Sequence, residues 1–117
     1  MSDIINKPWG YFQVLDSQAG YLIKKIFVKP DSKLSLQSHK YRSEHWIVTK
    51  GIANVIIEKN EYILQINESI YVPLGSKHRL ENNTKKDLII IEVQIGDTLT
   101  EDDIIRYEDI YGRDTIK

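Results

Sequence analysis

Apolar and polar residues alternate in short runs along this chain, a pattern that favours β-strands over helices. The runs are separated by turn residues such as Gly20, Pro30, Gly51 and Pro73. The predicted strands cover residues 11–15, 21–28, 34–39, 44–49, 53–58, 61–66, 69–72, 78–80 and 87–94. Lys59-Asn60 predicts a tight hairpin turn. This spacing is typical of an all-β sandwich or a closed antiparallel barrel.

The segment after the last predicted strand has a different pattern. Thr100 followed three residues later by Asp103 resembles a helix N-terminal cap. We therefore expect a short C-terminal helix near residues 102–107, with Ile104, Ile105 and Ile110 packed on the outside of the barrel. No internal repeat or linker interrupts the chain, so residues 1–117 are predicted to form one domain.

Composition supports the β-rich prediction and excludes several kinds of site. The 117 residues include 19 Ile and 6 Val but only 2 Ala, and β-branched residues favour strands. Lys and Arg together number 16 against 17 Asp and Glu, for a formal net charge of −1. This balance argues against a nucleic-acid partner, which needs a basic face. The absence of Cys excludes disulfides, thiolate nucleophiles and Cys-ligated zinc.

Neither a targeting signal nor a membrane span is expected. Residues 1–7 lack the basic and then apolar pattern of a signal peptide. The most apolar run, residues 88–93, is too short to cross a bilayer. We therefore expect a cytoplasmic protein without a membrane partner.

The three histidines have neighbours that suggest a metal site. Gln37 and His39 are two residues apart in a predicted strand, so their side chains share a face. Glu44 opens the next strand, and His78 follows the turn at residues 73–77. Two nitrogen and two oxygen ligands converging inside a barrel would suit a divalent ion such as zinc, manganese, iron or cobalt.

These residues resemble the paired motifs of the cupin superfamily, whose members are small antiparallel barrels, jelly-roll-like in architecture. The first motif is represented by Gln37, His39, Glu44 and Gly51. The second, Pro-x-Gly-x-x-His-x-x-x-Asn, is represented by Pro73, Gly75, His78 and Asn82. The resemblance implies a cupin barrel with Gln37, His39, Glu44 and His78 as metal ligands.

Further segments narrow the resemblance to the type II phosphomannose isomerases. Gln-x-His replaces the usual His-x-His of the first cupin motif. The other matching segments are residues 7–11, 34–39, 42–46, 78–82, 101–106 and 111–113. The resemblance implies interconversion of mannose 6-phosphate and fructose 6-phosphate through an enediol, with one divalent metal ion as cofactor. Zinc is the expected metal.

The resemblance also implies roles for residues near the ligands. The family has a functionally important Arg at the position of Arg42, which we expect to contact sugar oxygens or phosphate. His45 is a second catalytic candidate, although regular strand alternation would turn it away from Glu44. Lys40 and Arg79 are secondary phosphate-binding candidates, subject to the same alternation. The sequence does not identify the general base.

Departures from the family pattern leave other functions open. The family often has a run of His at positions 39–41, of which only His39 is present. A cupin enzyme acting on another phosphorylated or nucleotide-linked sugar is therefore an alternative, as is a non-catalytic sugar-binding module. The domain usually follows a mannose-1-phosphate guanylyltransferase, whose Gly-rich start is not found in this sequence. A separate guanylyltransferase is a candidate partner, and a homodimer is expected.

Overall fold

The computed structural model describes residues 3–100 and 102–111, and all the regular structure within them is β-strand. No helix in this described part is long and apolar enough to cross a membrane. The strands are β1 (Ile4–Lys7), β2 (Gly10–Gln18), β3 (Tyr21–Val28), β4 (Ser32–Lys33), β5 (Leu36–Ser38), β6 (Arg42–Lys50), β7 (Ala53–Ile57), β8 (Asn60–Leu64), β9 (Ser69–Val72), β10 (His78–Asn82), β11 (Leu88–Gly96) and β12 (Ile105–Glu108).

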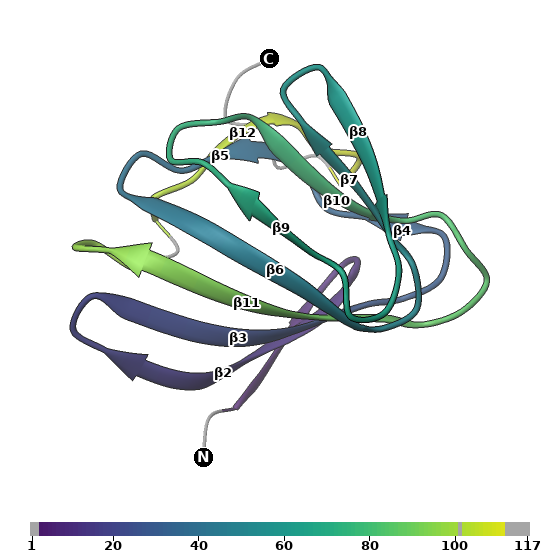
Figure 1. Ribbon diagram of the computed structural model, residues 1–117, viewed down its shortest axis with the longest axis horizontal. Coiled ribbons are helices and arrows are strands. Elements are labelled where there is room, and N and C mark those ends of the chain that lie inside the picture. The colour runs from purple at the N-terminus through teal and green to yellow at the C-terminus, as the bar shows by residue number, and fades with distance from the viewer. Residues whose placement is uncertain (1–2, 101, 112–117) are drawn as a thin grey trace.

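The strands form two antiparallel sheets that face each other (Figure 1). One sheet has the order β1-β2-β3-β11-β6-β9, and the other has the order β12-β5-β10-β7-β8, with β4 paired to β10. Strands adjacent in space are often distant in sequence, as are β3 and β11. The predicted all-β antiparallel architecture is thereby confirmed, and its interior is lined by residues from both halves of the chain.

The interior has an apolar end and a polar end. Along β11, the inward side chains are first Leu88 and Ile90 and then Glu92 and Gln94. Antiparallel β6 has the reverse order, with its polar inward residues first and its apolar ones last. The strand register places like residues side by side. Apolar Ile90 lies opposite apolar Val48, and polar Gln94 lies opposite polar Glu44. The apolar core therefore supports a polar mouth.

Most of the predicted strands are confirmed, and the differences are local. The turn between β7 and β8 is formed by residues 58 and 59, one residue earlier than predicted, and Glu58 has a φ of 53°. Strands β1, β4 and β12 were not predicted. The predicted strand at 34–39 is shortened to β5, because residues 34, 35 and 39 lie outside it.

The predicted C-terminal helix is wrong. The carboxylate of Asp103 accepts hydrogen bonds from the backbone N–H groups of Lys40 and Tyr41, both at 2.9 Å, instead of capping a helix. Residues 105–108 then pair with β5 as β12. Ile104 lines the interior cavity, while Ile105 and Ile110 remain exposed.

Arg79 fastens this C-terminal strand to the barrel. Its buried guanidinium donates to the backbone oxygens of Leu34 and Glu108, at 3.1 and 3.0 Å, and to the carboxylate of Glu108 at 3.0 Å. These bonds use the donors that a phosphate would need, and strand alternation turns Arg79 to the face opposite that of His78.

Arg79→Met should therefore destabilise the fold by about 1–3 kcal/mol, because two backbone carbonyls lose a charged donor. Urea unfolding should show this loss. Lys85→Met removes a cation from an exposed ion pair with Asp31 and should unfold close to wild type. Equal stabilities of the two variants would contradict a fastening role for Arg79.

Candidate metal centre

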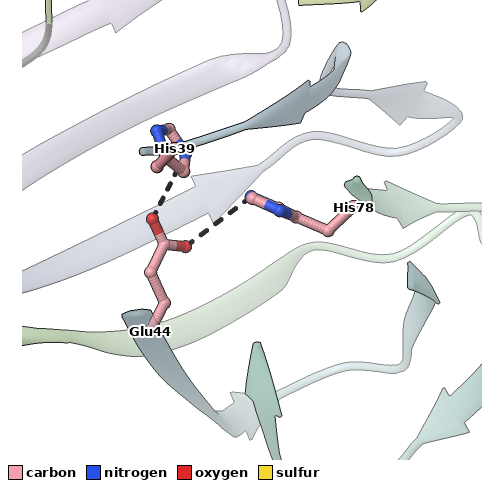
Figure 2. A group of neighbouring side chains, drawn as sticks. All are labelled: His39, Glu44 and His78. Atoms are coloured by element: carbon pink, nitrogen blue, oxygen red, sulfur yellow. Dashed lines mark ion pairs between the residues drawn. The ribbon is translucent and has the colours of Figure 1, made fainter. Parts of the chain in front are cut away.

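Three ligand-type side chains converge inside the polar mouth. His39 follows β5, Glu44 lies on β6, and His78 begins β10. Figure 2 shows both imidazoles directed toward the carboxylate. His39 Nε2 lies 3.3 Å from Glu44 Oε2, and His78 Nε2 lies 3.9 Å from Glu44 Oε1. All three side chains are buried, and one ligand atom from each lies within 4.8 Å of the other two.

Backbone carbonyls orient both imidazoles. His39 Nδ1 lies 2.6 Å from the carbonyl oxygen of Asp103, and His78 Nδ1 lies 3.0 Å from that of Ser76. A carbonyl only accepts, so each Nδ1 carries the proton and each Nε2 presents its lone pair to Glu44. The Gly75 N–H donates to the His39 carbonyl at 2.9 Å, which joins the two motif loops. This is the arrangement typical of histidines that bind a metal.

Gln37 lies beside this cluster. It pairs in register with His78, so the two side chains share a face, and it lines the same cavity. Its amide nitrogen donates to Ser35 Oγ at 3.2 Å. The amide oxygen is thus the atom of Gln37 with the right chemistry for a fourth ligand.

Glu44 is held in its ionised form by its neighbours. Arg42 Nε donates to Oε2 at 2.8 Å, and Trp46 Nε1 donates to Oε1 at 2.9 Å. Burial by itself would raise the pKa of Glu44, but His78, His39 and Arg42 more than offset burial and lower the pKa to about 2. The carboxylate is therefore available as an anionic ligand across the physiological pH range.

The histidines are held in their neutral form. Burial lowers the pKa of His39 to about 4, although Glu44 acts in the opposite direction. Burial also lowers the pKa of His78. Two neutral imidazoles, a carboxylate and an amide oxygen are a donor set that fits a divalent ion. Arg42 Nη2 lies 3.2 Å from His39 Nε2, so the guanidinium would have to yield that lone pair to a metal.

The cluster opens into a cavity with about 610 Å³ of empty space, its open mouth included. Besides the ligand residues, its charged lining residues are Lys7, Lys24, Arg42, Glu92 and Arg106. This excess of cations suits an anionic ligand.

The structure places only some of the other predicted site residues in the cavity. Arg42 is buried in the cavity beside Glu44, as alternation along β6 requires. His45 points to the outer face of β6, where its ring packs 4.8 Å from that of Tyr71. Lys40 is exposed, with its ammonium 5.4 Å from the ring centre of Tyr41. His45, Lys40 and Arg79 are therefore not brought to the cavity.

Asn82 of the second motif has a structural place. Its amide nitrogen donates to the carbonyls of Val28 and Lys86, at 3.0 and 2.7 Å, and its oxygen accepts from Thr84. It closes the loop between β10 and β11 and does not line the cavity.

Sequence reasoning did not assign Lys7, Lys24, Glu92 or Arg106 to the site. Strand alternation places Glu92 on the inward face of β11, but its cavity position also depends on the pairing of Glu92 with Lys24 across β11 and β3. Arg106 matched a family position, but the mistaken helix removed it from the sheet. Arg113, which also lies in a matching segment, is outside the described residues.

Comparison with known proteins agrees with this geometry. Residues 1–109 match the family described as mannose-6-phosphate isomerase C-terminal. The chain belongs to that family. This cupin-type phosphomannose isomerase domain is 50% identical over 111 residues to the alginate biosynthesis protein AlgA of Pseudomonas fluorescens, covering 95% of the chain and 23% of AlgA. It is 48% identical over 109 residues to the mannose-1-phosphate guanylyltransferase ManC of Salmonella typhimurium, covering 93% of the chain and 23% of ManC. The chain thus spans about a quarter of these relatives.

Solved structures share the fold of this isomerase-family domain. A cupin-2 domain protein from Rhodospirillum rubrum superposes with a TM-score of 0.73 at 17% identity, over 87% of this chain and 78% of the other. KdgF from a Halomonas species superposes with a TM-score of 0.77 at 13% identity, over 86% and 91% of the two chains. Such low identities establish the cupin fold alone.

The pKa of His39 predicts a pH-dependent contribution to stability in the metal-free protein. Its pKa is about 4 when folded and 6.5 when unfolded, so acid favours the unfolded chain. The contribution of His39 relative to His39→Gln should fall by about 3 kcal/mol as the pH decreases from above 6.5 to 4.

Urea unfolding of wild type and His39→Gln at several pH values would measure this difference. Because the difference between two proteins is compared, titration of carboxylates distant from His39 largely cancels. A difference that stays constant from pH 7 to pH 4 would contradict the low pKa of His39.

Proposed function

We propose that this domain interconverts mannose 6-phosphate and fructose 6-phosphate with a divalent metal ion, and that this ion is zinc. The observation that carries the proposal is the convergence of His39, Glu44 and His78 at the wall of a cation-lined cavity. Membership of the family supports the choice of substrate. Two imidazole ligands support zinc, while manganese, iron and cobalt remain alternatives to test.

The arrangement of side chains suits an isomerisation through an enediol. A metal ion held by Gln37, His39, Glu44 and His78 would polarise the sugar oxygens and stabilise negative charge on them. Arg42 lies beside these ligands, with Nε on Glu44 and Nη1 3.3 Å from the carbonyl oxygen of Thr100. We assign Arg42 to contact the reacting sugar oxygens, because a guanidinium stabilises developing oxyanions.

The phosphate needs cations farther from the ligands. Arg106 on β12 pairs in register with Gln37 on β5, so both residues face the cavity. Lys7, at the end of β1, also lines the cavity, with its ammonium 5.8 Å from the ring centre of Phe12. We assign Arg106 and Lys7 to the phosphate, in place of Lys40 and Arg79, because an Arg fork and an ammonium both suit phosphate oxygens.

The partners are proposed in the same way. We propose that the domain works in the cytoplasm as a homodimer, next to a mannose-1-phosphate guanylyltransferase activity in the same chain or a separate one. The name of the Salmonella relative supports that partner. Light scattering of the purified domain tests the homodimer, and a monomeric mass would exclude it.

Substitution of a proposed metal ligand should lower the metal content and the isomerase activity together. His39→Ala and Gln37→Ala should lower the metal content of the purified protein, His39→Ala more strongly because it removes an imidazole. Conversion of fructose 6-phosphate should fall at least a hundredfold in His39→Ala. Elemental analysis and a coupled assay measure the two quantities, and a chelator followed by zinc should abolish and restore wild-type turnover.

His45→Gln provides the comparison, since the His45 ring lies on the outer face. It should retain metal and turnover, and a large loss in this variant would restore a catalytic role for His45. Full turnover without bound metal would contradict the proposed function.

Arg106→Gln should raise KM for fructose 6-phosphate roughly tenfold or more, because a charge-assisted contact with phosphate is removed. Lys40→Gln, on the outer surface, should leave KM near the wild-type value. Steady-state kinetics of the two variants decides between the cations inside the cavity and the exposed one. A larger effect of Lys40→Gln would contradict the assignment of Arg106.

A further inference from the structure

A second carboxyl group in the cavity has no place in the metal site. Glu92 lies on β11, is 4% exposed, and lines the cavity that contains His39, Glu44 and His78. It pairs in register with Lys24 on β3 and with Trp46 on β6. Glu44 and Glu92 thus lie on neighbouring strands and point into one cavity from the same sheet.

The surroundings of Glu92 are polar on one side and apolar on the other. Gln94 Nε2 donates to Glu92 Oε1 at 2.8 Å. Lys24, its cross-strand neighbour, is buried with its ammonium 4.1 Å from the ring centre of Phe12. Ile26 and Ile90 lie in the next inward layer. A buried carboxyl group placed in a cavity with a cation beside it is a typical general acid–base.

We propose that Glu92 is the group that moves the proton between C1 and C2 of the sugar phosphate, with Lys24 as its positioning residue. This inference rests on the proposed isomerase function. It supplies the general base that the sequence did not identify, and it gives the two buried carboxyl groups of the cavity separate tasks.

The proton transfer balances without a co-reactant. The Glu92 carboxylate removes the proton from C2 of the open-chain aldose, and the C–H electron pair forms the C1=C2 double bond of an enediolate. The charge on O1 is then quenched as a proton passes from O2 to O1. The protonated Glu92 returns its proton to C1, and the electron pair on O2 forms the C2 carbonyl of the ketose.

The electrostatics of the cavity agree with this role. Burial, followed by the charge of Glu44, raises the pKa of Glu92 to about 8, while Lys24, Arg42 and the hydrogen bond from Gln94 act against that rise. His39, His78, Lys7 and Arg106 are the other titratable or charged groups that line the same cavity. Near neutral pH both protonation states of Glu92 are accessible, as a group that takes and returns a proton requires.

Isotope exchange with solvent tests the assignment. Metal-loaded wild type, Glu92→Gln and Glu61→Gln would convert fructose 6-phosphate in deuterium oxide, with turnover and carbon-bound deuterium followed by proton NMR. In Glu92→Gln, turnover and deuterium incorporation should fall together by 10²- to 10⁴-fold. Metal content and thermal stabilisation by fructose 6-phosphate should stay at wild-type values, because the amide can still accept from Gln94. Glu61→Gln, an isosteric change on exposed β8, should match wild type.

Three results would overturn the role of Glu92. They are turnover of Glu92→Gln within a few-fold of wild type, loss of metal or sugar-phosphate binding along with activity, and wild-type turnover without any deuterium incorporation. If wild type converts neither sugar phosphate, the proposed function fails and this assignment falls with it. An active wild type with an active Glu92→Gln refutes this assignment alone.

Lys24→Met gives a second test that does not need the Glu92 variant to fold. Lys24 lowers the pKa of Glu92, so its removal should move the acid limb of the kcat/KM profile to higher pH. The melting temperature and metal content of Lys24→Met confirm that it is folded. An unshifted acid limb would contradict the pairing of Lys24 with Glu92.

Discussion

The buried carboxylate of Glu44 is the interaction on which the polar half of this barrel depends. Burying a carboxylate is costly unless its charge and lone pairs are satisfied. Arg42 and Trp46 donate to it from its own strand, and His39 and His78 face it from the loop after β5 and from β10. One side chain therefore links both sheets at the polar mouth. Arg42 and Trp46 satisfy the Glu44 oxygens, and the two imidazoles that face this carboxylate are the candidate metal ligands.

Two carboxyl groups in one cavity differ in protonation because their neighbours differ. His78, His39 and the cationic donor Arg42, which lies 2.8 Å from Glu44, together keep the pKa of Glu44 low. Burial raises the pKa of Glu92, and the nearby charge of Glu44 adds to that rise. Such a pair suits an isomerase site, where one carboxylate stays ionised and the other exchanges a proton. The cations of the cavity then remain for sugar oxygens and phosphate.

The local sequence pattern correctly predicted the direction of several side chains, but it wrongly predicted the C-terminal helix. The alternation of β6 correctly turned Arg42 inward and His45 outward, because successive strand residues point to opposite faces. Alternation along β10 likewise turned Arg79 away from the cavity that His78 lines. The capping pattern at Thr100 and Asp103 was misleading, since Asp103 found stronger partners in the backbone of residues 40 and 41. There, hydrogen bonds to backbone groups 63 and 62 residues earlier in the chain prevailed over the local helix-capping pattern.

The sequence by itself determined the β-rich class and the faces that Arg42 and His45 present, and it supplied four candidate metal ligands, since these follow from short-range periodicity and motif spacing. Only the tertiary structure decided which inward residues meet. Lys24 meets Glu92, and Arg106 meets Gln37, through the register of strands far apart in the chain. Register between distant strands depends on how the whole barrel closes, and a one-residue slip would turn each side chain to the other face.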